Sequence, residues 1–236
     1  MNRKPLRMVN VFDPNIVTRT NLADVPFLLS KYHPHLSKAQ HNERLIAAAH
    51  EASHLLVALL SGTTNIGTQA YIRVPGRASK YGGKRGVRAS VPIGNLDSHK
   101  ADMMVSLAGS LFSGMVEPDN ELAGSVDLVD YRNRLEEYAT DNGMSFEFAE
   151  ETFGQQIINE TAACLIKYWS TIDWIATALL LSCTVNGDLK LLPIVDYFYR
   201  DRERLIISKR SNYFVIPTKH LDYVAARKEF AIPAEM

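Results

Sequence analysis

Apolar residues recur at helical spacing along most of the chain, and short breaks rich in glycine, proline or asparagine separate these stretches. The first stretch runs from Lys38 to Leu60, and Ser61-Gly62 is a typical helix C-terminus after it. Five further helices are predicted, over Asp97–Val116, Ser125–Thr140, Ser145–Lys167, Trp169–Cys183 and Pro193–Leu205.

Strand signals are fewer. Thr68 to Val74 reads as a strand, and the glycine-rich and basic stretch up to Pro92 predicts a β-hairpin. Tyr213 to Ile216 is a candidate edge strand. We therefore expect a mainly α fold, a helical domain with a small β-hairpin or sheet. Its predicted organisation is an N-terminal extension over residues 1–37, the main domain over 38–206 and a C-terminal tail over 207–236 packed on that domain.

Composition places the chain among ordinary globular proteins, with 46% hydrophobic and 22% charged residues. Lysine and arginine balance aspartate and glutamate at 26 each, so the net charge gives no case for nucleic-acid binding. The two cysteines, Cys164 and Cys183, exclude a disulfide scaffold. The most apolar window, Trp174 to Val185, is shorter than the roughly 20 residues of a membrane span. We expect a soluble, cytoplasmic protein without a membrane span.

The first predicted helix carries an HExxH motif, His50-Glu51-Ala52-Ser53-His54. Residues four apart share one face of a helix, so His50 and His54 can bind one metal ion. Glu51 then lies beside the metal, where it can take a proton from a bound water. The pattern is typical of zinc-dependent hydrolases, most often peptidases.

A catalytic zinc needs a third protein ligand. A metzincin would carry glycine and histidine where Val57 and Leu60 stand, so that class is excluded. Glu117 and Glu121 remain as ligands of the thermolysin type, and Asp127, in the first turn of a later helix, is the other candidate.

A second chemistry is suggested by the basic hairpin between Arg73 and Arg88, which could bind phosphate or nucleic acid. As a P-loop it fails, because Ala78 replaces the first glycine and Arg85 follows Lys84 where serine or threonine is required. A solvated basic loop is the favoured interpretation.

Five segments, in order, resemble the peptidase domain of the FtsH-type membrane-bound AAA proteases, peptidase family M41. They are Glu43–His54 around the motif, Tyr71–Ala78, Ser106–Gly114 with its Leu-Ala-Gly, Gly124–Leu128, and Trp174–Leu189. The resemblance covers roughly residues 38–195, and only the HExxH is specific by itself.

The resemblance implies that Zn²⁺ is held by His50, His54 and Asp127 and that Glu51 is the general base. The chain departs from the family at two positions: Ser53 replaces a glycine, and Val126 replaces an asparagine next to the third ligand. Serine is small enough to be tolerated, with its hydroxyl bonded to the helix backbone. Valine removes a hydrogen bond that would support the ligand.

The implied function is that of a zinc metalloendopeptidase acting on a peptide or protein substrate. The strand that holds Tyr71, Ile72, Arg73 and Val74 would bind an extended peptide at its edge. No part of the chain resembles the family's ATPase module, so we expect an ATP-independent enzyme. Its substrates would be unfolded or flexible polypeptides, or proteins delivered by a separate unfoldase or adaptor. The alternative is a catalytically inactive, peptidase-like binding or regulatory protein that uses the former substrate groove.

Overall fold

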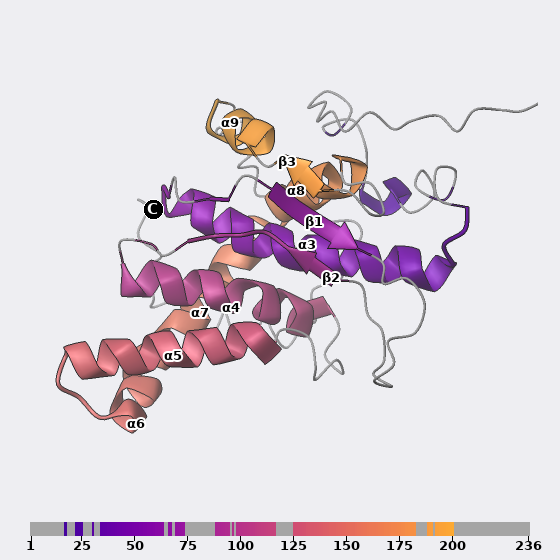
Figure 1. Ribbon diagram of the computed structural model, residues 1–236. Helices are drawn as coiled ribbons and strands as arrows, with labels where there is room; N and C mark the ends of the chain where they lie inside the picture. Colours follow the sequence, from indigo (N-terminus) through magenta and orange to yellow (C-terminus); the bar gives the residue numbers. More distant parts are fainter. Residues whose placement is uncertain are drawn as a thin grey trace, which may run out of the picture.

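The computed structural model describes residues 17, 22–25, 30, 34–63, 66–67, 69–73, 88–94, 96, 98–116, 125–182, 188–190 and 192–200. Most of these residues are helical, and a small sheet accompanies them, so the predicted mainly α class is confirmed (Figure 1). The elements are η1 Leu22–Asp24, α3 Lys38–Leu60, β1 Gln69–Arg73, β2 Arg88–Ser90, α4 His99–Val116, α5 Ser125–Asp141, α6 Phe146–Ala149, η2 Glu150–Gly154, α7 Gln155–Lys167, α8 Trp169–Ser182, β3 Asp188–Lys190 and α9 Leu192–Arg200.

Helix α3 has the predicted bounds, and local hydrogen bonds fix both its ends. The Ser37 hydroxyl accepts from the backbone N–H of Gln40, whose side chain accepts from the backbone N–H of Ser37. This reciprocal capping box satisfies N–H groups that a helix start leaves unpaired. At the other end Gly62 has a φ of +74°, a left-handed conformation that glycine adopts without steric cost.

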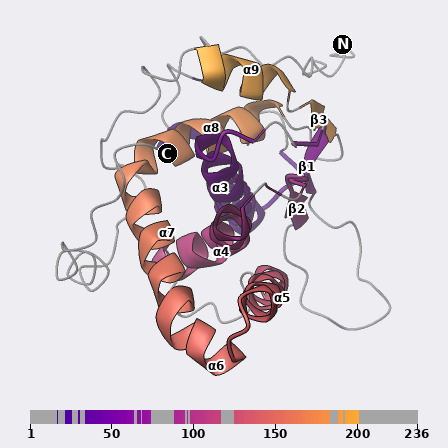
Figure 2. The ribbon, with the colours of Figure 1, turned by 90° about the vertical axis from the view of Figure 1, so that its left-hand side faces the viewer.

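Helix α3 is the centre of the fold. The side chains from Leu55 to Leu60 are all buried, so its C-terminal half is covered on every side. Helix α4 packs along one flank of α3, and α8 packs along another. Helix α5 lies beyond α4, and α7 runs from α6 to α8 on the side away from the sheet (Figure 2). A helix surrounded in this way holds its side chains rigidly.

The three strands form one antiparallel sheet in the order β2-β1-β3. Tyr71 faces Ser90 of β2 on one side and Asp188 of β3 on the other. The predicted hairpin is thus present in the pairing of β1 with β2, and its tip, residues 74–87, lies outside the described residues. Both β1 and β2 pack on α3.

Two features differ from the sequence-based prediction. Strand β3 is absent from that prediction, because Asn186-Gly187-Asp188 is typical of a turn. The helix predicted over 145–167 is interrupted by a π-helical turn at Glu150–Gly154. There a Cβ on Gly154 would lie 2.9 Å from the Tyr131 hydroxyl, so glycine permits the close contact with α5. The last predicted helix is described from Leu192 to Arg200, and its predicted continuation to Leu205 lies outside the described part.

Among the described residues, no single helix is long and apolar enough to cross a membrane. The pair Phe146–Lys167 and Trp169–Leu181, bent by 74°, reaches that length and composition only when both members are counted together. Most of the predicted extension, and all of the predicted tail with its edge strand at Tyr213–Ile216, fall outside the described residues.

Candidate metal centre

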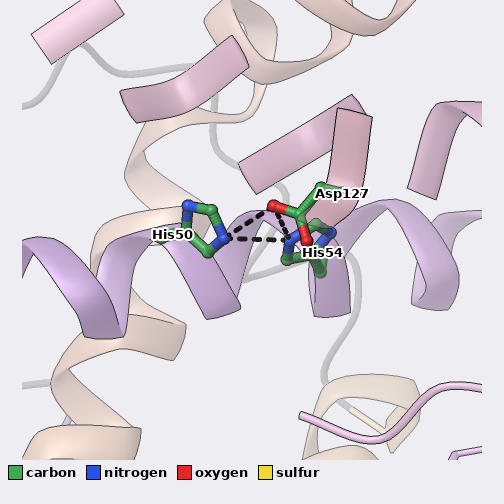
Figure 3. A group of neighbouring side chains, drawn as sticks. All are labelled: His50, His54 and Asp127. Carbon is green, nitrogen blue, oxygen red and sulfur yellow. Dashed lines mark hydrogen bonds and ion pairs between the residues drawn. The ribbon is translucent and has the colours of Figure 1, made fainter. Parts of the chain in front are cut away.

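The two histidines of the HExxH motif lie one turn apart on α3 and point to the same side (Figure 3). Their Nε2 atoms are 3.2 Å apart. The other faces of α3 are packed against neighbouring elements. Both imidazoles converge on the remaining face, as the four-residue spacing predicts.

Asp127 completes the group from the first turn of α5. Its Oδ2 lies 3.0 Å from Nε2 of His50 and 3.4 Å from Nε2 of His54. Tetrahedral zinc with bonds of about 2.1 Å separates its ligand atoms by about 3.4 Å. The three distances between the nitrogen and oxygen atoms are close to that edge length. His50, His54 and Asp127 can therefore hold one metal ion, as the sequence predicts.

Helix α4 orients both imidazoles through contacts to their Nδ1 atoms. His54 Nδ1 lies 2.6 Å from the carbonyl oxygen of Val105, and His50 Nδ1 lies 3.0 Å from the hydroxyl of Ser113. A carbonyl only accepts hydrogen bonds, so Nδ1 of His54 carries the proton. The lone pair of Nε2 is then available to a metal, which is the tautomer that metal-binding histidines use.

Two more residues of α4 meet the ligand atoms. The Ser110 hydroxyl donates to Oδ2 of Asp127 at 3.1 Å. Gly109 faces the imidazoles so closely that a Cβ there would lie 2.3 Å from Nε2 of His54 and 2.5 Å from Nε2 of His50. These lengths are near those of metal–nitrogen bonds.

Glu51 is buried next to the three candidate ligands. Its Oε2 accepts a hydrogen bond of 2.7 Å from the backbone N–H of Val91, which follows β2 directly. Burial raises the pKa of Glu51, whereas the nearby His54 and His50 partly offset that effect. A general base works best when its pKa lies near the operating pH, and the raised pKa of this carboxyl is closer to neutral pH.

The charges of Asp127 and His54 stabilise each other. Burial raises the pKa of Asp127, but the hydrogen bonds that His50 and His54 donate whenever Nε2 carries a proton outweigh it and hold that pKa well below its ordinary range. Burial lowers the pKa of His54, but the bond to Asp127 and the charge of Glu51 outweigh it and raise that pKa. Asp127 is thus ionised at neutral pH, as a metal ligand must be.

The other predicted ligands, Glu117 and Glu121, lie outside the described residues, so they stay open as alternatives. Among the described residues, Asp127 is the candidate third ligand that lies at the histidines. Ser53 bonds to the helix backbone as expected, its hydroxyl donating to the carbonyl of Ala49 at 2.8 Å. Val126 is 71% exposed and points away, and Asp127 is supported by Ser110 instead.

The predicted open edge of the strand with Tyr71 is wrong, because β1 is the central strand and has β2 and β3 as neighbours. Ile72 is buried in the core. The side chains of Tyr71 and Arg73 and the whole of Val74 lie outside the described part, so their contact with substrate stays a prediction. The described edge strand next to Glu51 is β2.

Four residues around the site are absent from the sequence-based prediction: Gly109, Ser110, Ser113 and Val91. In the sequence the three on α4 stand out only as part of the Ser106–Gly114 segment that resembles the M41 family, with no role at the metal site. The spacing of Ser110 and Ser113, three residues apart, places both on one helix face and is the signal that could have found them. Nothing local marks Val91, because its role depends on a backbone N–H.

The basic hairpin of the phosphate-binding alternative lies outside the described residues between 74 and 87. Among the described residues, one group of histidine, cysteine, aspartate or glutamate side chains has metal-binding geometry, formed by His50, His54 and Asp127. Comparisons of the chain with models of protein families, with curated proteins and with solved structures find no match.

Proposed function

We propose that this chain is a zinc-dependent peptidase of the FtsH-like type, with His50, His54 and Asp127 as metal ligands and Glu51 as general base. The observation that carries the proposal is the convergence of the three ligand atoms beside a buried carboxylate. A purely structural metal site has no need of Glu51, because its coordination is complete without a base.

We propose zinc as the metal, because two histidines and a glutamate in HExxH spacing on one helix are typical of zinc peptidases. Two imidazole nitrogens and one carboxylate oxygen are a common protein ligand set of catalytic zinc, and they leave the fourth tetrahedral position to water. Magnesium and calcium prefer oxygen ligands, which makes them poor candidates for a site with two histidines.

The reaction would be the addition of water to a peptide carbonyl. When bound, zinc supplies a Lewis acid that lowers the pKa of a coordinated water to about 7 and stabilises the developing oxyanion. Val91 engages Oε2 of Glu51, and we assign the proton of the water to Oε1. As the new carbon–oxygen bond forms, Glu51 takes this proton. It then delivers the proton to the leaving nitrogen when the carbon–nitrogen bond breaks.

A substrate would bind as an extended segment along β2. This strand lies at an edge of the sheet, and the residue after it contacts the general base. A peptide that adds to this edge would pass close to Glu51, and main-chain hydrogen bonds would supply affinity without requiring a particular sequence. Unfolded or flexible polypeptides in the cytoplasm, unaided or presented by a separate unfoldase or adaptor, fit such a site.

The test compares wild type with Glu51→Gln in zinc content and in cleavage of an unfolded protein such as casein. Glutamine retains an oxygen that can accept from Val91, so the variant should fold and bind zinc. We expect stoichiometric zinc in both proteins and cleavage in wild type only. Equal cleavage by Glu51→Gln would refute the assignment of the base. Zinc binding without cleavage in wild type would favour the inactive binding protein instead.

A further inference from the structure

We propose that α4 sets the geometry and the affinity of the metal centre. Gly109 has no side chain and leaves room beside the imidazoles, and Ser110 and Ser113 are positioning residues. The inference rests on the proposed metal site but concerns residues that hold no metal themselves. Each of the three positions on α4 meets a different part of the ligand set.

Gly109 provides the space for an ion. An ion at bonding distance from both imidazoles must lie about 2.1 Å from each Nε2. A Cβ at position 109 would lie 2.3 Å and 2.5 Å from those same two atoms, too close for any real Cβ, so the imidazoles would have to shift from the positions in which both can bind one ion. Helix α4 itself does not require the glycine, because Gly109 has an ordinary helical backbone without a positive φ.

Ser113 and the Val105 carbonyl fix the two imidazole rings. Both contacts are made to Nδ1 and leave Nε2 to face the metal. Ser113 is almost fully buried, so bulk water cannot replace His50 as the hydrogen-bond partner of its hydroxyl. Loss of this hydroxyl would let the His50 ring rotate and would weaken metal binding.

Ser110 fixes the third ligand, which comes from a different helix. Its hydroxyl donates to Oδ2 of Asp127, the carboxylate oxygen nearest to both imidazoles. The bond joins α4 to the first turn of α5, the turn that delivers Asp127. Ser110 thereby orients a ligand that α3 does not carry. It also supplies the supporting hydrogen bond that Val126 cannot supply.

The first experiment uses two glycines of the same helix. A Cβ on Gly114 would meet no neighbouring atom within 4 Å, so Gly114→Ala is the matched control for Gly109→Ala. Alanine favours a helix at both positions. We expect Gly114→Ala to bind one zinc ion with wild-type affinity and Gly109→Ala to lose stoichiometric zinc. Wild-type zinc affinity in folded Gly109→Ala would overturn the role of Gly109.

The second experiment replaces the hydroxyls and remains decisive if Gly109→Ala fails to fold. Ser110→Ala and Ser113→Ala should each weaken zinc binding by about 10–100-fold, the usual effect of losing a group that orients a metal ligand. Ser106→Ala, on the same helix, is the control and should bind zinc as wild type does. Ser110→Thr retains the hydroxyl and should restore the affinity.

Cobalt(II) substitution gives a readout that a general loss of stability would not move. Ser110→Ala and Ser113→Ala should alter the visible absorption bands of the bound cobalt, because the ligand field changes, whereas Ser106→Ala should not. Unchanged zinc affinity and cobalt spectra in both serine variants would overturn the proposal. That result differs from failure of the peptidase assignment, which would appear as normal zinc binding without cleavage by wild type.

Discussion

The backbone N–H of Val91 donates to Oε2 of Glu51 at 2.7 Å, which ties the end of β2 to the carboxylate beside the metal ligands. The two residues lie 40 positions apart in the chain; Val91 directly follows strand β2, and Glu51 belongs to helix α3. A hydrogen bond therefore links the end of an edge strand to a candidate general base.

Val91→Pro removes this donor and should reduce peptide cleavage about 10–100-fold, because a hydrogen bond to a charged group contributes about 1.5–3 kcal/mol. The N–H also favours the ionised carboxylate, so its loss should raise the pKa of Glu51 further. The acidic limb of the pH–rate profile should then move to higher pH. Val91→Ala, which retains the N–H, is the control for lost packing. Equal rates and profiles in the two variants would show that the bond has no catalytic part.

Asp127→Asn should abolish stoichiometric zinc binding, because the amide removes the negative charge and weakens the third ligand. Glu117→Gln and Glu121→Gln are the matched variants for the alternative ligands and should bind zinc as wild type does. The measurement is metal content after dialysis against zinc-free buffer. Zinc lost from either glutamate variant and retained by Asp127→Asn would move the third ligand away from α5.

The parts of the fold that can be predicted from the sequence are those that local signals determine. The bounds of α3 follow from its apolar run and from Gly62, and the pairing of His50 with His54 follows from helical spacing alone. Both features need only residues in or next to one helix.

The parts that cannot be predicted depend on residues distant in sequence. Strand β3 spans three residues and exists through its pairing with β1, and that pairing makes β1 central rather than an edge. Ser113 and Val105 acquire their roles only because α4 packs on the histidine face of α3. Side-chain chemistry at short spacing cannot encode such contacts.

Zinc affinity should fall as the pH falls. The bond to Asp127 and the charge of Glu51 raise the pKa of His54 despite its burial, so this imidazole takes up a proton at a higher pH than an ordinary histidine. A metal must displace that proton, whereas Asp127 with its lowered pKa stays ionised throughout. Competition with a chromophoric chelator at several pH values between about 5.5 and 8.5, a range that brackets histidine titration, measures the slope. A flat affinity over that range would contradict protonation of His54.

Cys164 should be inert to alkylation in the folded protein. Burial raises the pKa of its thiol to about 12, so almost no reactive thiolate is present near neutral pH. In a Cys183→Ala background, Cys164 should react with iodoacetamide only after denaturation, and peptide cleavage should survive treatment of the native protein. Rapid native labelling would contradict this burial, and loss of cleavage on labelling would point to a thiol in the reaction.

A substrate that pairs with the edge of β2 should respond periodically to backbone methylation. In an extended strand, N–H groups point alternately toward and away from the partner strand. A peptide substrate methylated at one amide nitrogen at a time should therefore show a raised KM at alternate positions near the cleaved bond and little change at those between. The amide of the cleaved bond itself is left out, because its methylation affects the chemistry directly. A Glu51→Gln protein that binds the same peptides with the same alternation would assign the effect to binding. Uniform tolerance of methylation would exclude strand pairing and leave side-chain contacts as the source of affinity.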